Sequence, residues 1–338
     1  MSRIIMSIES GGSKTLCLLQ TAEGELLGWG LGGPTHHLKL EEAASSFQQA
    51  IKMAMEGSGV AGAQVSLIFS SQLGQFDALQ TALGRVGLEK EFVYIDDPTV
   101  TLFGALCRDW GVVALSGTGS FVYGRNREGR CLRVGGLGDL LGDDGSGFDV
   151  GLSGLRAALR YLGGWEQQTM LAEEICKEWN LSEFDATDVF LNSSTQNIMG
   201  KVLQALPDNY RHLIAKLSRV VARCAYQGDA VSQAIIHQAG KKLAEQVVAV
   251  CNRIEMGDDP IPVGYAGGCW RIGDMLIEAF QEALQIRMTK SFRTIPQMLE
   301  PAFGVYLAAL KHMNKPWENT LLSRLRQDNE VVKKAIST

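Results

Sequence analysis

The sequence lacks the cysteine patterns that bind metals or staple small folds. Its seven cysteines never occur as C-x-x-C, and their number is odd. This argues against a zinc site and a disulfide framework, and it favours reduced thiols in a cytoplasmic protein. The five histidines are scattered and form no metal-binding pattern.

The sequence also lacks an excess of positive charge, and it lacks long apolar runs. The 32 Lys and Arg residues face 37 Asp and Glu residues, a net charge of −5, which argues against nucleic-acid or membrane-surface partners. No apolar run approaches the roughly 18 residues of a membrane span. The first residues enter a strand pattern directly, without the pattern of a signal peptide. At 338 residues and 46% hydrophobic content, the chain is predicted to be a soluble globular protein of two domains.

What the sequence does contain is glycine turns between strand patterns, most clearly in the run 111–151. The apolar residues 112–115 lead into Ser116-Gly117-Thr118-Gly119-Ser120, and a second apolar stretch, 121–123, follows. This predicts a hairpin whose turn can form an anion-binding nest of backbone N–H groups. A second glycine-rich loop, 142–147, adds Asp143 and Asp144. N–H groups that can bind phosphate, close in sequence to carboxylates, favour a function in phosphoryl transfer. The run by itself also fits two surface turns with solvated Asp side chains.

The beginning of the chain has the same layout. A strand pattern over 3–8 is followed by the turn 9–13, a strand over 14–20 and another over 26–30. The same series of elements, namely strand, Gly/Ser turn, strand, Glu-Gly turn and strand, thus occurs twice in the chain. The repetition predicts two similarly folded halves, each bringing a phosphate hairpin to a shared cleft.

Two familiar nucleotide motifs do not fit these turns. Gly117 and Gly119 begin a G-x-G-x-x-G pattern, but Val122 stands at its last position and a strand follows instead of a helix, so the Rossmann fingerprint fails. In residues 11–15 no glycine directly precedes Lys14, and a strand follows Thr15. That turn is therefore not a P-loop.

Two further places could carry chemistry. Asp96 and Asp97 follow a short strand over 92–95 and precede a helix predicted over 100–107. An acid at the carboxyl end of a strand is a common catalytic position, but Asp97-Pro98 could also cap that helix. In the second place, glycines at 264, 267 and 268 follow an apolar strand. They could receive a flat base or form a plain turn.

The chain after Gly151 is dominated by apolar stripes at helical spacing, which we interpret as packing faces. Helices are expected at 153–162, 167–179, 197–205, 210–227, 230–253, 272–283 and 301–312, and the tail after Pro316 is polar.

Taken in order, these elements resemble the sugar-kinase, Hsc70 and actin-type ATPase superfamily. Within it they are similar to the BadF/BadG/BcrA/BcrD ATPase family, which includes N-acetylglucosamine kinase. The resemblance spans roughly residues 4–312 and is strongest over 117–147, GTGSxxYGRNxxGxxxRxGGxGxLLGDxGSG. It implies an α/β fold of two actin-like, ribonuclease H-like ATPase domains with a cleft between them. We expect the domains at 1–115 and 116–300, the second with helical insertions, and residues about 301–338 packing back on the first.

The resemblance also implies roles for individual residues. Asp97 falls on the catalytic base, and Glu9 on a position that holds Mg²⁺ through water. The expected groups are, for the ATP phosphates, Gly11, Gly12, Ser13, Lys14, Thr15, Gly117, Thr118, Gly119 and Ser120; for adenosine, Gly264, Gly267 and Gly268; and for the sugar, His36, Asp97, Thr118, Gly136, Leu137 and Asp143.

Several positions depart from the family pattern. Glu9 stands where Asp is frequent, Thr35-His36-His37 replaces an Asn-bearing turn, Pro98 replaces Ala, and Leu137 replaces Trp. The phosphate positions are kept while the sugar-facing positions vary. The resemblance therefore implies a kinase without naming its particular sugar.

The expected function is an ATP-dependent kinase of an amino sugar, such as N-acetylglucosamine or glucosamine, with ATP and Mg²⁺ as cofactors. The alternatives are an ATPase that activates a radical dehydratase, and a catalytically weak nucleotide- or sugar-binding regulator. The first alternative needs paired cysteines for an iron–sulfur cluster, and none is spaced as a ligand. We expect a small-molecule partner, no nucleic acid and no membrane, and leave a homodimer open.

Overall fold

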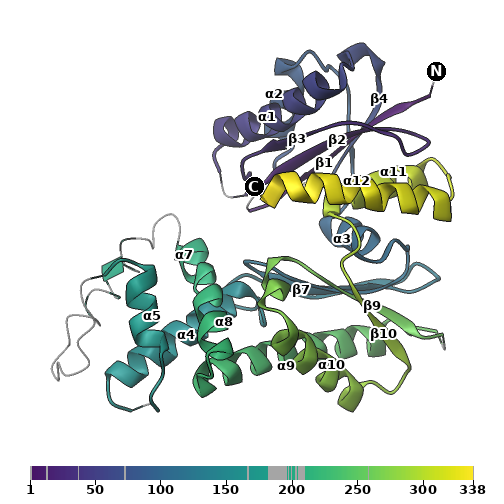
Figure 1. Cartoon of the computed structure of the whole chain (residues 1–338). Helices are drawn as coiled ribbons and strands as arrows, with labels where there is room; N and C mark the ends of the chain where they lie inside the picture. Colours follow the sequence, from purple (N-terminus) through teal and green to yellow (C-terminus); the bar gives the residue numbers. More distant parts are fainter. Residues whose placement is uncertain are drawn as a thin grey trace. The chain divides into compact units, whose positions relative to one another are not determined.

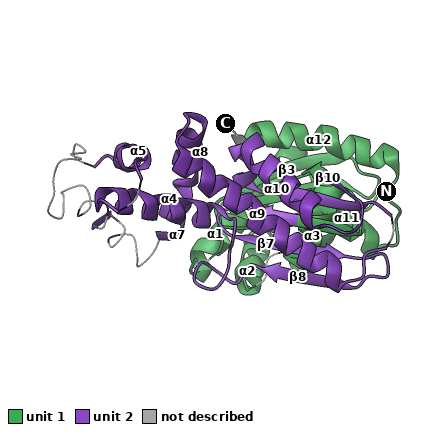
Figure 2. Cartoon of the chain, turned by 90° about the horizontal axis from the view of Figure 1, so that it is seen from below, with its two compact units in different colours: residues 1–113, 295–338 green, residues 114–294 purple. Residues whose placement is uncertain are grey.

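The chain folds into two compact units, each built around one five-stranded sheet (Figures 1 and 2). Unit 1 comprises Met1–Val113 and Ile295–Thr338, and unit 2 comprises Ala114–Thr294. The coordinates are a computed structural model. It describes residues 2–12, 14–36, 38–71, 74–165, 167–181, 196, 198, 200, 201, 204, 210–257 and 259–337.

The sheet of unit 1 has the strand order β3-β2-β1-β4-β5. Its strands are β1 (Ile4–Ser10), β2 (Thr15–Thr21), β3 (Leu26–Gly32), β4 (Val65–Ser70) and β5 (Val93–Tyr94). The pairs β1–β2 and β2–β3 are antiparallel, whereas β1–β4 and β4–β5 are parallel. This arrangement puts the β1–β2 turn and the end of β5 at the same edge of the sheet, because β1, β4 and β5 run in one direction.

Both faces of this sheet are covered, which explains why β2 is buried along its whole length. One face is covered by helices α1 (Leu40–Ser58) and α2 (Phe76–Arg85). Phe47 of α1 packs there in one core with Met6 and Ile8 of β1. Ile5 alternates with Met6 and therefore faces the opposite side.

Three helices from distant parts of the chain complete unit 1. They are α3 (Asp97–Leu106), α11 (Pro301–His312) and α12 (Asn319–Ser337). Helix α11 packs against α3 and β1, and Tyr306 donates from its hydroxyl to the carbonyl of Thr21 at 2.8 Å. Both α11 and α12 are drawn in yellow-green to yellow in Figure 1. The C-terminal segment is thus an integral part of unit 1.

The sheet of unit 2 has the order β10-β9-β6-β7-β8. Its strands are β6 (Gly111–Ser116), β7 (Ser120–Arg125), β8 (Cys131–Gly135), β9 (Ile261–Ala266) and β10 (Phe292–Pro296). The chain passes from unit 1 to unit 2 within β6 and returns within β10. Unit 2 is therefore one continuous segment, whereas unit 1 is made of two.

Helices account for most of the remainder of unit 2. They are α4 (Gly147–Leu162), α5 (Leu171–Glu178), α7 (Tyr210–Lys216), α8 (Ser218–Tyr226), α9 (Ala230–Arg253) and α10 (Asp274–Arg287). Helices α9 and α10 lie side by side, and α9 contacts β7 and β8 (Figure 1). Short 3₁₀ helices occur at Gly62–Gln64 in unit 1 and at Gly268–Ile272 in unit 2.

Several boundaries expected from the sequence are wrong. Helix α4 begins at Gly147 rather than 153, because Ser146 caps it by accepting from Asp149 N. The predicted 210–227 helix is two helices that break at Leu217. The tail that looked merely polar forms α12, and no strand was expected at β10. The helix predicted at 197–205 lies largely outside the described residues.

Candidate active site

The first glycine turn joins β1 to β2 and is closed by backbone hydrogen bonds. Gly11 N donates to Lys14 O at 2.9 Å, and Thr35 N donates to Gly11 O at 3.1 Å. The hydroxyl of Thr15 donates to Gly33 O at 2.8 Å. Ser13, which was expected to bind phosphate, lies outside the described residues. Within the described residues, these bonds tie Gly11 to Lys14 and to Thr35.

Carboxylates and one lysine gather beside this turn. Lys14 Nζ pairs with Glu300 Oε2 at 2.8 Å, and both side chains are largely buried. Burial first, and then the neighbouring charge of Asp97, raises the pKa of Glu9 to about 8, while Lys14 acts in the opposite direction. Unit 1 therefore brings together Glu9, Lys14 and Asp97, three of the residues that the resemblance places in the site, and adds Glu300, which the sequence did not point to.

Asp96 and Asp97 divide two tasks that the sequence left open. Asp96 Oδ1 accepts from Thr99 N at 3.0 Å and caps α3. Asp97 is the first residue of the helix, and Pro98 follows it in the first turn. The cap is thus Asp96, so the alternative that Asp97 caps the helix is wrong, whereas Pro98 does lie in the first turn. The carboxylate charge of Asp97 also raises the pKa of Tyr94, after burial as the first cause.

His36 lies next to the same turn. It is exposed, and its Nδ1 lies 4.0 Å from where a side chain on Gly12 would begin. The neighbouring Thr35 is buried and is held by Gln75 Nε2, which donates to its carbonyl at 3.1 Å. His36 is thus an exposed imidazole on a fixed backbone beside the first phosphate turn.

The second glycine turn, between β6 and β7, is docked on the start of α4. Gly147 N donates to Gly117 O at 2.7 Å, and Phe148 N donates to Thr118 O at 3.2 Å. Gly117 N itself donates to Gly119 O at 2.8 Å within the turn. These bonds hold the turn in one conformation, as a preorganised anion-binding turn requires.

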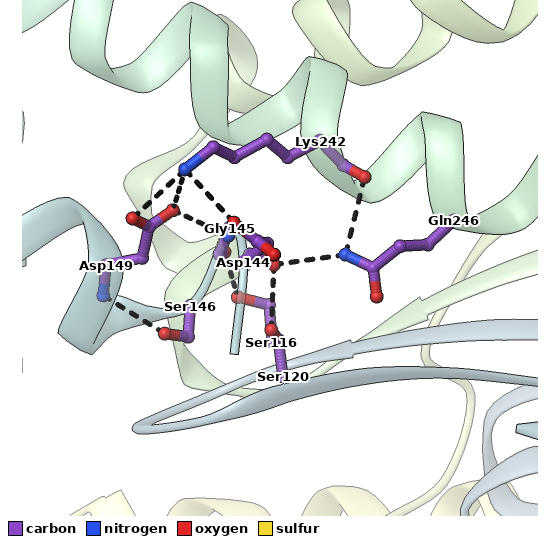
Figure 3. Close-up of polar contacts among 8 residues, drawn as sticks. All are labelled: Ser116, Ser120, Asp144, Gly145, Ser146, Asp149, Lys242 and Gln246. Atoms are coloured by element: carbon purple, nitrogen blue, oxygen red, sulfur yellow. Dashed lines mark hydrogen bonds and ion pairs between the residues drawn. The ribbon is translucent and has the colours of Figure 1, made fainter. Parts of the chain in front are cut away.

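The two serines that flank this turn hold the loop 142–147 in place. Ser116 Oγ donates to Gly145 O and Ser120 Oγ donates to Asp144 O, both at 2.8 Å (Figure 3). The hydroxyl of Ser120 is therefore used within the protein, and its backbone is what it can offer to a phosphate.

Asp143 is not a solvated loop residue. It is only 3% exposed, has a φ of 59°, and accepts from Arg211 Nη2 at 2.6 Å. Arg211 Nε lies 3.5 Å from Asp139 Oδ1, so one guanidinium serves two acids. A Cβ on Gly119 would lie 2.9 Å from Asp143 Oδ2. The expected sugar acid is thus in direct contact with the expected phosphate turn.

Gly136 and Leu137 belong to the same region of unit 2. The carbonyl of Gly136 accepts from Arg133 Nη2 at 2.7 Å, and the φ of Gly136 is 68°. Leu137 is 67% exposed, and its Cβ would lie 3.1 Å from a Cβ on Gly142. The exposed apolar side chain of Leu137 therefore begins beside Gly142, the residue that precedes Asp143 in the chain.

The glycines expected at adenosine have different environments. Gly264 is buried within β9. Gly267 has a φ of 104°, and a Cβ there would lie 2.4 Å from Ser116 O, so close packing on β6 demands glycine. A Cβ on Gly268 would meet nothing within 4 Å. Trp270 lies in the 3₁₀ helix that begins at Gly268. Its Nε1 donates to Ala114 O at 3.2 Å, which ties this helix to β6.

Within the described ranges, no three His, Cys, Asp or Glu side chains gather as a group that could hold a metal ion. The carboxylates of Glu9 and Asp97 beside the β1–β2 turn are ligands of the kind that hold Mg²⁺ together with substrate phosphates. Six of the seven cysteines are buried and only Cys131 is exposed. None of the described helices is long and apolar enough to cross a membrane.

Residues that the sequence reasoning missed share one property, which is distance along the chain. Glu300 is 286 positions from Lys14, and Arg211 is 68 positions from Asp143. No local pattern marks such partners. The start of α4 did carry a local signal, since Ser146 followed by Asp149 has the spacing of a capping box.

Comparison with known proteins gives one consistent family. The model of the BadF/BadG/BcrA/BcrD ATPase family matches residues 8–309. An N-acetylmuramic acid/N-acetylglucosamine kinase from Clostridium acetobutylicum is 27% identical over 317 residues, 91% of this chain and 98% of that protein. An N-acetyl-D-glucosamine kinase from Dictyostelium discoideum is 30% identical over 161 residues, 47% of this chain and 46% of that protein.

Solved structures agree on the fold. A candidate N-acetylglucosamine kinase from Chromobacterium violaceum has a TM-score of 0.65 at 20% identity, covering 91% of this chain and 99% of that one. A ROK family glucokinase from Streptomyces griseus, solved with glucose and AMPPNP, has a TM-score of 0.53 at 15% identity, covering 91% and 98%. The α/β fold with two actin-like sheets is thereby confirmed.

Proposed function

Because the chain belongs to the BadF/BadG/BcrA/BcrD ATPase family, we propose that it is an ATP-dependent kinase of an amino sugar. The observation that carries the proposal is the group Glu9, Lys14 and Asp97 beside the β1–β2 turn. The relative that matches most of this chain is named for phosphorylating N-acetylmuramic acid and N-acetylglucosamine. We propose the same substrate class here, and we propose that units 1 and 2 are the two actin-like domains.

Asp97 is the general base in this proposal. A sugar hydroxyl is a poor nucleophile, so a carboxylate within hydrogen-bond reach accepts its proton as the phosphoryl group arrives. The position of Asp97 at a helix start, with the cap assigned to Asp96, is compatible with that role. The proton moves to Asp97, and the hydroxyl oxygen forms the new bond to phosphorus as the bond to ADP breaks.

The two glycine turns would bind the ATP phosphates. The proposed donors are the backbone N–H groups of Gly12, Ser13 and Thr15 in unit 1 and of Thr118, Gly119 and Ser120 in unit 2, with the ammonium of Lys14. The N–H groups of Gly11 and Gly117 donate within their own turns, so these two glycines would line the phosphates and shape the turns. Transfer of a phosphoryl group needs positioning and charge neutralisation more than covalent chemistry. Mg²⁺, when bound with ATP, neutralises phosphate charge; Glu9 is the residue proposed to hold it through water.

The remaining proposed roles concern recognition. Gly264, Gly267 and Gly268 would receive adenosine, where the open space at Gly268 leaves room for a flat base. His36, Thr118, Gly136, Leu137 and Asp143 would contact the sugar together with Asp97. Since ATP is the proposed phosphoryl donor, we also propose a cytoplasmic location. A homodimer stays a prediction.

The direct test is ADP release measured by a coupled assay across a panel of sugars. The panel contains N-acetylglucosamine, glucosamine, N-acetylmuramic acid, glucose and N-acetylmannosamine, and Asp97→Asn serves as the inactive control. Turnover of one or more amino sugars above glucose supports the proposal. No turnover of any sugar by wild-type protein that binds ATP would overturn it in favour of a regulator.

A further inference from the structure

Lys242, on the helix α9, pairs with two carboxylates of one short segment. Its Nζ lies 2.9 Å from Asp149 Oδ2, 3.1 Å from Asp149 Oδ1 and 3.2 Å from Asp144 Oδ1 (Figure 3). The lysine side chain is 29% exposed. Burial alone lowers the pKa of Lys242, but the pairs with Asp149 and Asp144 outweigh burial and raise it. The ammonium therefore stays charged.

These ion pairs continue into hydrogen bonds that end at the second glycine turn. Asp149 also accepts from Gly145 N at 2.8 Å. The carbonyls of Gly145 and Asp144 accept from Ser116 and Ser120, the two residues that flank the turn. Figure 3 shows this chain of contacts from α9 through the loop to the β6–β7 hairpin.

The same loop carries Asp143, whose Oδ2 lies 2.9 Å from the Cβ position of Gly119. A shift of the loop would therefore move the proposed sugar-binding acid and the proposed phosphate turn together. Without the ammonium, the partly buried Asp149 would lose its cationic partner while the more exposed Asp144 kept a like charge nearby, which destabilises their present arrangement.

We propose that Lys242 is a positioning residue for phosphoryl transfer, which holds the loop 143–146 against the turn 116–120. It acts through Asp144 and Asp149 and is not itself a catalytic residue. The inference rests on the proposed kinase function. Gln246, one helical turn further along α9, donates to Asp144 O at 3.3 Å and adds a weaker second tie.

The test compares Lys242→Met, Lys242→Arg and the control Lys241→Met, which removes the same charge from an exposed neighbouring position. Losing one partner of such a pair should raise the KM for ATP and the KM for sugar about tenfold each in Lys242→Met. The value of kcat should change less, since Asp97 and its surroundings are untouched. Lys242→Arg should recover most of the loss, and Lys241→Met should resemble wild type.

A merely structural role gives a different result. Lower stability reduces the fraction of active enzyme, so the apparent kcat would fall while both KM values stayed at the wild-type level. That pattern, or equal effects of Lys242→Met and Lys241→Met, would overturn the proposal.

A double variant separates charge compensation from general damage. Asp149→Asn keeps an oxygen that can accept from Gly145 N but removes one of the two negative charges. Lys242→Met/Asp149→Asn should therefore have KM values closer to wild type than Lys242→Met alone. If Lys242→Met does not fold, the double variant is compared with Asp149→Asn alone. KM values that the second substitution leaves as high as in Lys242→Met count against Lys242. In the comparison with Asp149→Asn alone, a further tenfold rise of both KM values in the double variant counts against it, because loss of Lys242 would then act without Asp149.

Hydrogen exchange gives a readout that does not depend on turnover. Amides of residues 143–149 should exchange faster in Lys242→Met than in wild type or Lys241→Met, because Gly145 N–H loses a held acceptor. Unchanged exchange would overturn the inference. If no sugar is phosphorylated by wild type, the proposed function fails, and the exchange result still tells whether Lys242 fixes the loop.

Discussion

The glycine turns of the two units are supported by different interactions. Beside the turn of unit 1, burial and the charges of Asp97 and Glu300 raise the pKa of Glu9 to about 8, and Lys14, which pairs with Glu300, acts on Glu9 in the opposite direction. The turn of unit 2 is held by neutral hydrogen bonds from Ser116 and Ser120 and by the amides of α4.

This difference suggests a division of tasks. Unbalanced negative charge costs stability, but it places titratable groups where a proton must move. A turn held by neutral hydrogen bonds costs little stability and can present its remaining N–H groups as fixed donors. Substitutions in unit 1 should therefore change the rate and its dependence on pH, whereas substitutions in unit 2 should change KM values.

The largest effect is expected for Asp97→Asn. Loss of a general base lowers kcat by roughly 10²–10⁴-fold, while ATP binding measured by calorimetry should stay near wild type. The control is Asp96→Asn, which keeps an oxygen to cap α3. A kcat near wild type in Asp97→Asn would break the comparison, since the acids of unit 1 would then have no part in the rate.

Gly119→Val should raise the KM for ATP by on the order of tenfold or more, because a branched side chain would occupy the position 2.9 Å from Asp143 Oδ2. Steady-state kinetics at saturating sugar measure this change. The matched control is Gly117→Ala, whose Cβ would meet only Gly119 O at 4.0 Å. Unchanged ATP kinetics in Gly119→Val would make the turn a plain hairpin.

Asp143→Ala should raise the KM for sugar about tenfold and the KM for ATP less, because a site built on hydrogen bonds loses affinity when a partner is removed. Both constants are measured on the same preparation. Asp139→Ala is the control, since Asp139 shares Arg211 with Asp143. Matching effects of the two variants would mean that Arg211, rather than contact with sugar, explains the loss.

The smallest effect concerns stability. The folded-state pKa of Glu9, about 8, lies above its ordinary value of 4.5, so the stability it contributes is fully present below pH 4.5 and is lost as pH rises towards 8. The slope is at most about 1.4 kcal/mol per pH unit. Urea midpoints of wild type should therefore fall between pH 5 and 8 relative to Glu9→Gln.

Glu25→Gln, at an exposed position, is the control for that series. Parallel pH profiles of wild type and Glu9→Gln would show that Glu9 carries no proton in the folded protein near neutral pH. A raised pKa of Glu9 would then no longer distinguish the turn of unit 1 from the turn of unit 2.

Local patterns predicted both hairpins and most helices, because alternation, glycine turns and apolar spacing are properties of neighbouring residues. They failed where tertiary contacts decide. Lys242 looked like an ordinary helix surface residue, although it pairs with Asp149, 93 positions away. Helix α12 had a readable signal in Leu322, Leu325 and Val332, which are buried. The polar residues between them concealed it.

The roles assigned to individual site residues rest on the family resemblance and stay predictions. What the structure adds is which of them share a neighbourhood within one unit. Glu9, Lys14 and Asp97 do so in unit 1, and Gly119 and Asp143 do so in unit 2.

The path of the chain through β6 and β10 has a consequence for synthesis on the ribosome. Unit 2 is one continuous segment, Ala114–Thr294, whereas unit 1 needs Ile295–Thr338 to supply α11 and α12. Domains generally fold as units while the chain emerges. The first segment of unit 1 is therefore made before unit 2 but must wait, with the apolar surface later covered by α11 exposed, until Ile295–Thr338 has been made. Unit 1 is thus begun before unit 2 and completed after it.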